Sequence, residues 1–192
     1  MIEVFNIKKG LFYGVLNLNE YAISRNLSIK RQIETEGSKF LINKLLNKNV
    51  NILYNENGKP YLDNEISHIS ISHSHDRLAI IINENEATGI DIELIRDKVK
   101  VIKTKFLSEN ELLDAGDNVE KLIIYWAAKE ALYKIYGEPE VEFIKHLFIN
   151  PFVIDNSGSI TGQINHSVIK NTFELNYQIL NNYILVYVLN KL

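Results

Sequence analysis

The sequence predicts an α+β fold made of two comparable halves. Three observations support this class. Short runs with the composition of strands occupy residues 2–18, 50–94 and 141–189. Segments with helical spacing of apolar residues separate them at 29–45 and 99–137. The two kinds of element do not alternate regularly, as they would in a doubly wound parallel sheet.

Length and composition fit a compact protein. The chain has 192 residues, of which 46% are hydrophobic and 23% charged, enough apolar material for a sizeable core. At a typical domain size of about 150 residues, this length falls between one domain and two. No linker rich in glycine, serine or proline interrupts the chain. We therefore expect two halves, 1–95 and 96–192, that pack directly against each other.

Charge and cysteine content exclude several functions. A net charge of −3 argues against a protein whose whole surface binds nucleic acid, because phosphate binding requires a basic excess. The absence of cysteine excludes disulfides, thiolate metal sites and a thiol nucleophile. The N-terminal residues lack the apolar stretch of a signal peptide, and no segment approaches about 18 uninterrupted apolar residues. We expect a cytoplasmic protein without membrane partners.

The first half should contain a hairpin, a basic helix and a series of strands. Strands at 2–7 and 11–18 form the hairpin, and Ser28 is the expected N-cap of the helix. Further strands are expected at 50–54, 69–72, 78–83 and 88–94. The polar side of the helix carries Lys30, Arg31, Lys39 and Lys44.

In the second half, a capping pattern and one long helix stand out. Ser108 and Glu111 have the spacing of a capping box, which explains both residues without any chemistry. The segment 119–136 has the most regular helical pattern and ends at Gly137. Strands are expected at 141–154, 159–164, 172–180 and 183–189.

Two acidic residues follow each other closely on a predicted strand. Alternation directs Asp91 and Glu93 to one face, while Ile90 and Ile92 face the core. Because neighbouring anions repel, the pair either lies exposed at a sheet edge or holds a cation between its carboxylates. In the second case, hard oxygen ligands favour Mg²⁺.

On the long helix, Trp126, Glu130 and Lys134 follow at four-residue spacing and share one face. Glu130 and Lys134 are therefore neighbours. An ordinary surface ion pair at this spacing contributes only about 0.3 kcal/mol. A single tryptophan is more often a packing residue than a binding platform.

The run from His73 to Asp76 invites comparison with zinc hydrolases, because alternation would place His73 and His75 on one face. In the binuclear-zinc pattern, however, the aspartate lies two residues after the second histidine and another histidine follows it. Here Asp76 is adjacent to His75 and Arg77 follows. The spacing disfavours a zinc hydrolase.

In their order along the chain, these motifs resemble one family. The motifs are Ile71-Ser72-His73-Ser74, Gly89-Ile90-Asp91-Ile92-Glu93, Phe106 with Glu111, and Trp126-x-x-Lys129-Glu130-Ala131-x-x-Lys134. They are similar to those of the 4′-phosphopantetheinyl transferases, and most similar to the Sfp-type group, named for the surfactin-synthetase activator. Gly58-Lys59-Pro60-Tyr61 matches too, so the resemblance covers about residues 58–137.

The resemblance implies a fold and an activity. The fold is a monomer of two similar α+β halves packed as an intramolecular pseudo-dimer, with the active site at their junction. The activity is Mg²⁺-dependent transfer of the 4′-phosphopantetheine moiety of coenzyme A to a serine of an apo carrier protein, with release of 3′,5′-ADP, as in holo-[acyl-carrier-protein] synthases. Such carriers serve fatty acid, polyketide and nonribosomal peptide biosynthesis.

The resemblance also implies roles for individual residues. The implied metal ligands are Asp91, Glu93 and Glu130. The implied coenzyme A contacts are Lys39, Lys59, Ser72, His73 and Lys134. The implied catalytic residues are Glu111, Glu130 and Lys134, and the general base is Glu111, Glu130 or a metal-bound water. Lys129 is expected to be a second basic contact or a surface residue.

The family's carriers are small and acidic, so we expect them to dock near residues 99–118. Apolar contacts there would come from Phe106, Leu107 and Leu112, and complementary charge from Lys98, Lys100, Lys103 and Lys105. A solvated helix face explains the lysines equally well. The main alternative function is a non-catalytic carrier-binding module of the same fold, which would have no reason to keep converging acidic residues.

Overall fold

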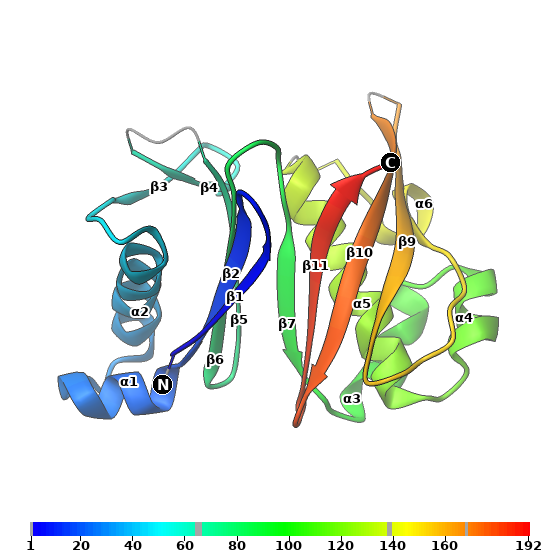
Figure 1. Ribbon diagram of the computed structural model, residues 1–192. Coiled ribbons are helices and arrows are strands. Elements are labelled where there is room, and N and C mark those ends of the chain that lie inside the picture. The colour runs from blue at the N-terminus through cyan, green and yellow to red at the C-terminus, as the bar shows by residue number, and fades with distance from the viewer. Residues whose placement is uncertain (1, 64–66, 138–139, 168) are drawn as a thin grey trace. The chain divides into compact units, whose positions relative to one another are not determined.

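The computed structural model describes residues 2–63, 67–137, 140–167 and 169–192 (Figure 1). The chain forms two compact units, residues 1–88 and 89–192. This boundary precedes the strand that carries Asp91 and Glu93, whereas a division at residue 95 follows it. Both acidic residues therefore belong to the second unit.

The first unit combines an antiparallel sheet with two helices. Its elements are β1 (Ile2–Lys8), β2 (Leu11–Asn17), α1 (Leu18–Arg25), α2 (Lys30–Leu46), β3 (Ile52–Tyr54), β4 (Pro60–Leu62), β5 (His68–Ser74) and β6 (Arg77–Asn83). The strand order of the sheet is β1-β2-β6-β5, and β3 and β4 form a separate two-stranded ribbon. Helix α2 packs on the sheet through Leu41 and Ile42, both fully buried.

The second unit is a five-stranded antiparallel sheet with one long helix across one face (Figure 1). Its elements are β7 (Ile90–Leu94), α3 (Lys98–Ile102), the 3₁₀ helix η1 (Lys103–Lys105), α4 (Glu109–Ala115), α5 (Val119–Tyr136), α6 (Phe143–His146), β8 (Leu147–Ile149), β9 (Ser157–Asn165), β10 (Lys170–Leu180) and β11 (Tyr183–Lys191). The strand order is β7-β11-β10-β9-β8.

Helix α5 is the centre of the second core because apolar residues cover most of its circumference. Ile124, Ala128 and Ala131 are completely buried, and they pack with Leu175 and Val186 of the sheet. A helix that is apolar nearly all round must be buried rather than lie on the surface. This burial fixes the position of every polar residue that α5 carries.

The α+β class predicted from the sequence is confirmed, as are the N-terminal hairpin and the long helix. Three details were predicted wrongly. Residues 18–25 form a helix, capped by the Asn17 side chain, which accepts hydrogen bonds from the backbone of Asn19 and Glu20. The strand β4 was not expected, and 141–154 contains the short α6 and β8 instead of one long strand.

Of the two predicted helix caps, one is present in the structure and one is not. Helix α2 has Ile29 at its N-cap, with no side-chain cap hydrogen bond, so Ser28 does not cap it. At α4, the capping box of Ser108 and Glu111 is present as predicted. Among the described residues, no helix is both long and apolar enough to cross a membrane.

Candidate active site

Strand β7 and helix α5 are in direct backbone contact at one point. A Cβ atom on Gly89, just before β7, would lie 1.9 Å from the carbonyl oxygen of Ala131 on α5. Only glycine can occupy this position, because such a contact is far inside van der Waals distance. The close approach brings the side chains that follow Gly89 within reach of the helix.

The acidic residues of β7 meet the polar face of α5. The indole Nε1 of Trp126 donates to Oε1 of Glu93 at 2.9 Å, and Nζ of Lys134 donates to Oδ1 of Asp91 at 2.8 Å. Lys134 also donates to the carbonyl oxygen of Ile90 at 2.9 Å. We call these residues, together with Glu130, the β7–α5 seam.

These contacts decide between the interpretations left open by the sequence. Asp91 is only 4% exposed, so its carboxylate is not at an exposed sheet edge. Lys134 bonds to the strand, so Glu130 and Lys134 are not an isolated surface pair. Trp126 packs, but it also donates a hydrogen bond to an acidic side chain.

Glu130 lies between Trp126 and Lys134 on α5 and has an unusual ionisation. The pKa of its carboxyl is raised to about 7, chiefly by burial and then by the negative charge of Asp91, with a smaller contribution from Glu93, while Lys134 opposes the shift. Each of these charges must lie close to Glu130 to act on it. A carboxyl that titrates near neutrality can accept or donate a proton at physiological pH.

The residue types of the seam fit a divalent cation, although the present spacing of their side chains does not. Asp91, Glu93 and Glu130 present hard carboxylate oxygens, and their mutual repulsion would be relieved by a bound Mg²⁺. Within the part of the chain that the structure describes, no three acidic or histidine side chains are close enough to share one ion. In this arrangement, the ammonium of Lys134 supplies the positive charge beside Asp91.

Glu111 and Lys129 lie deeper in the second unit. Lys129 is 0% and Glu111 3% exposed, and Nζ of Lys129 lies 2.7 Å from Oε2 of Glu111. Oε2 also accepts from the backbone N and the hydroxyl of Ser108, while Oε1 accepts from the backbone N of Ile149. Burial lowers the pKa of Lys129, and Glu111 opposes this. Lys129 is therefore not a surface residue.

The sequence contained a signal for this burial. Leu122, Tyr125, Lys129 and Leu132 follow at spacings of three and four residues, a stripe on one helix face. A lysine within such a stripe needs an acidic partner in the core. Only the fold shows that Glu111 is that partner.

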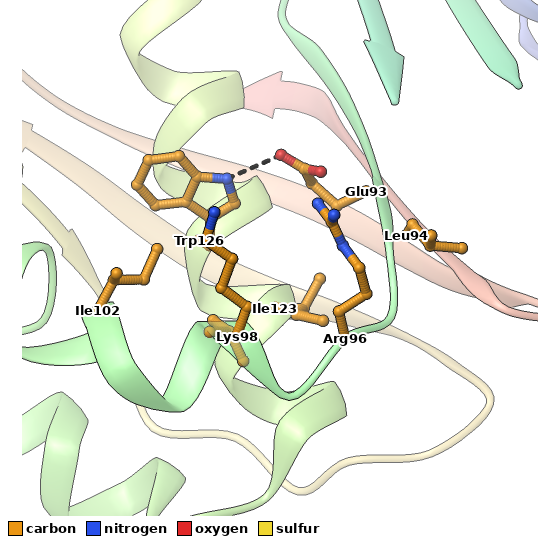
Figure 2. Close-up of a pocket in the computed structure, with 8 residues that line it drawn as sticks. Glu93, Leu94, Arg96, Lys98, Ile102, Ile123 and Trp126 are labelled. Carbon is orange, nitrogen blue, oxygen red and sulfur yellow. Dashed lines mark hydrogen bonds between the residues drawn. The ribbon is translucent and has the colours of Figure 1, made fainter. Parts of the chain in front are cut away.

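A pocket of about 190 Å³ opens beside Glu93 (Figure 2). The apolar part of its wall is formed by Trp126, Ile102 and Ile123. Positive charge at the pocket comes from Arg96 and Lys98. Figure 2 shows the hydrogen bond between Trp126 and Glu93 at this pocket. The pocket thus offers an apolar surface next to the acidic end of the seam.

The coenzyme A contacts expected in the first unit lie on α2, β5 and the β3–β4 connection. Ser72 is 8% exposed, whereas Nε2 of His73 lies 3.8 Å from Oε2 of Glu34 on α2. Lys39 is exposed, and its charge contributes, after the Asn51 hydrogen bonds, to a lowered pKa of Asp63.

Lys59 lies in the turn between β3 and β4, at the opposite end of the ribbon from Asp63, which accepts two hydrogen bonds from Asn51. The charge of Lys39 therefore acts at the open end of the ribbon and not at the turn that carries Lys59. His75, in contrast, lies in the β5–β6 turn with a φ of 53°, so it does not share a strand face with His73. The strand alternation assumed for a zinc hydrolase ends before His75.

Part of the expected carrier-docking surface is not accessible. Phe106 is 1% and Leu107 2% exposed, so neither can contact a partner, because both belong to the core. The exposed apolar residues of this region are instead Val101 on α3, at 81%, and Leu113 on α4, at 83%.

Fold and seam together define an α+β protein that gathers carboxylates and a lysine between one strand and one long helix. A family model of the 4′-phosphopantetheinyl transferase superfamily matches residues 87–188, just over half of the chain. The protein belongs to this superfamily, whose members are transferases that move phosphopantetheine from coenzyme A to carrier proteins. No curated protein matches the chain.

The match has nearly the same limits as the second unit. It includes all residues of the β7–α5 seam as well as Glu111 and Lys129. The expected coenzyme A contacts of the first unit, Lys39, Lys59, Ser72 and His73, lie outside it.

Proposed function

We propose that the protein is an Sfp-type enzyme that transfers 4′-phosphopantetheine from coenzyme A to a serine of an apo carrier protein. The observation that carries the proposal is the β7–α5 seam. It lies inside the part of the chain that matches the superfamily, and it combines three carboxylates with a lysine. A non-catalytic carrier-binding module would gain nothing from the electrostatic repulsion that this arrangement costs.

The reaction is a phosphoryl transfer. The serine hydroxyl of the carrier attacks the phosphorus that bears the pantetheine, and the bond from that phosphorus to the bridging oxygen breaks. The serine proton passes to a base, and 3′,5′-ADP leaves with the negative charge. Such reactions require positioning of the nucleophile and stabilisation of charge on both phosphates.

Lys134 would stabilise the charge that develops on the phosphates. Its ammonium lies at the seam, bonded to Asp91, where a pyrophosphate oxygen could compete for it. Glu130 could take the serine proton only while it is not bound to Mg²⁺, because its raised pKa of about 7 belongs to the metal-free seam and a bound cation would lower it. Glu111 is less suited to this role, since its oxygens already accept hydrogen bonds from Ser108, Lys129 and Ile149.

The residues that would hold Mg²⁺ are Asp91, Glu93 and Glu130. Mg²⁺ held by these residues would supply positive charge that neutralises the pyrophosphate of coenzyme A. For Asp91 to take part, the ammonium of Lys134 must share or leave its carboxylate. The same movement would make Lys134 available to the phosphates.

Two further groups of residues would bind the nucleotide end and the pantetheine arm of coenzyme A. Lys39, Lys59, Ser72 and His73 would bind the nucleotide end of coenzyme A through its phosphates. The pocket beside Glu93 would accept the uncharged pantetheine arm against Trp126 and Ile102.

The carrier would dock on α3 and α4. Val101 and Leu113 offer exposed apolar contacts there, and the exposed Lys98 offers charge complementary to an acidic partner, whereas Lys100 forms an ion pair with Asp97. This surface replaces the buried Phe106 and Leu107 as the expected apolar contacts.

Intact-protein mass spectrometry tests the proposal directly. The protein, coenzyme A and Mg²⁺ are mixed with a panel of apo carriers from fatty acid, polyketide and nonribosomal peptide pathways. We expect one carrier or more to gain the mass of one phosphopantetheinyl group, and Glu130→Ala to remove this gain. Glu109→Ala, at an exposed position on α4 outside the seam, serves as a control for folding. Binding of a carrier without any mass gain would support the non-catalytic module instead.

A further inference from the structure

Lys129 and Glu111 form an ion pair shielded from water. Their side chains are 0% and 4% exposed, and the charged atoms are 2.7 Å apart. Removing two charges from water costs free energy that their attraction does not reliably recover, so a buried pair is weak evidence for stability. The pair must therefore be explained by what it holds in place.

The pair holds two backbone segments by charge-assisted hydrogen bonds. Nζ of Lys129 donates to the carbonyl oxygen of Phe106 at 2.8 Å and to that of Phe143 at 3.0 Å. Its third donor is used by Glu111. Since Phe106 precedes α4 and Phe143 begins α6, one ammonium connects α5 to segments on either side of it in the sequence.

Both phenylalanine side chains pack against Trp126. The ring of Phe106 meets the indole at a centroid distance of 5.0 Å and an interplanar angle of 71°. The ring of Phe143 lies 5.4 Å away at 34°. Trp126 is thus held from two segments, and its Nε1 donates to Oε1 of Glu93 at 2.9 Å.

We infer that Lys129 and Glu111 are a positioning pair, which holds Phe106 and Phe143 against Trp126 and thereby fixes the carboxylate of Glu93. The inference rests on the proposed function, which assigns Glu93 to the metal. Because both members are enclosed in the core, we assign them a positioning role rather than a catalytic one. Their effect on the site passes through the indole.

The test compares two ion pairs that connect the same helices. The double variant Lys129→Met, Glu111→Gln removes both buried charges at nearly constant volume, so no unpaired charge is left in the core. The control Lys121→Met, Asp114→Asn removes the other ion pair between α4 and α5, in which Nζ lies 2.9 Å from Oδ2. A purely structural role predicts the same outcome for both variants.

Two readouts report on the positioned groups rather than on stability. Trp126 is the only tryptophan, so its emission and its quenching by acrylamide in the metal-free protein report on its packing. Titration with Mn²⁺ as the probe ion, followed by calorimetry well below the melting temperature, reports on the metal site.

We expect the Lys129→Met, Glu111→Gln variant to show a red-shifted, more readily quenched Trp126 and about tenfold weaker Mn²⁺ binding, the usual effect of removing support behind a metal ligand. The control variant should retain wild-type values. In a protein that already carries Trp126→Phe, adding the same double substitution should cause little additional loss of Mn²⁺ affinity. The reason is that the hydrogen bond from the indole to Glu93 is already absent.

Unchanged quenching and Mn²⁺ affinity in the folded variant would overturn the inference, as would equal changes in the control. An altered indole with unchanged Mn²⁺ affinity would also overturn it, since Glu93 would then not depend on Trp126. If the wild type neither binds Mn²⁺ nor modifies any carrier, the proposed function fails. The quenching of Trp126 then decides by itself whether the pair positions the indole.

Discussion

Replacing Glu130 with glutamine should stabilise the metal-free protein while it abolishes transfer. The side chain lies partly buried beside Asp91 and Glu93, and these surroundings raise the pKa of its carboxyl to about 7. In the unfolded chain the same carboxyl titrates near 4.5. The folded state therefore binds its proton more tightly than the unfolded state does, and ionisation works against folding.

The size of the effect follows from this difference in pKa. One pKa unit corresponds to about 1.4 kcal/mol, so the shift from 4.5 to about 7 corresponds to about 3 kcal/mol. Below pH 4.5 both states hold the proton and the penalty is absent. It grows as the pH rises and is complete above pH 7. Glutamine has no charge to bury and escapes the penalty at every pH.

Thermal denaturation followed by Trp126 fluorescence measures this effect in the second unit. At pH 8 without metal, Glu130→Gln should melt about 6 to 12 °C above the wild type, since each kcal/mol shifts the melting temperature of a protein of this size by about 2 to 4 °C. At pH 5 the two proteins should differ by less than about 1 kcal/mol. Added Mg²⁺ should stabilise the wild type more than the variant.

A variant no more stable than the wild type at pH 8 would refute this reasoning, because the carboxylate would then not be repelled by its neighbours. Glu109→Gln provides the matched control. Glu109 is exposed on α4, and its loss should change stability by less than about 0.5 kcal/mol at either pH.

Three further predictions concern other parts of the site. Gly89→Ala should lower the free energy of unfolding of the second unit by about 3 kcal/mol or more, because the new methyl would overlap the carbonyl of Ala131. Chemical denaturation measures this loss, and a wild-type midpoint would contradict the close contact. Lys134→Ala should lower kcat for transfer by about 100-fold or more in the mass-spectrometric assay. Wild-type turnover would exclude its role at the phosphates. The His73 side chain is 49% exposed, so His73→Ala should leave the melting temperature unchanged. The same substitution should raise the KM for coenzyme A, because it removes a proposed phosphate contact. An unaltered KM would show that His73 does not bind the substrate.

The extent to which the sequence predicts this site depends on the periodicity of the elements involved. Asp91 and Glu93 on a strand, and Trp126, Glu130 and Lys134 on a helix, were placed on shared faces correctly, because spacings of two and four residues define a face without knowledge of the fold. The helix α1 was missed because it is short and its stability depends on the Asn17 cap and tertiary packing.

Periodicity does not predict contacts between segments that are far apart in the sequence. The interpretation of Lys129 as a surface residue or a phosphate contact failed because its partner, Glu111, is 18 residues away and meets it only in the folded core. Likewise, Phe106 and Leu107 have the composition of a docking patch, yet both pack inward. Neither composition nor spacing contains this information.

By itself, the sequence determined the fold class, the superfamily motifs and which acidic and basic residues share a face, since these follow from local periodicity. The tertiary structure alone decided that Gly89 lets β7 touch α5, that Lys134 bonds to Asp91, and that Glu130 titrates near neutrality. Burial and the nearness of other charges set the pKa of a carboxyl, and both arise only when distant segments of the chain pack together.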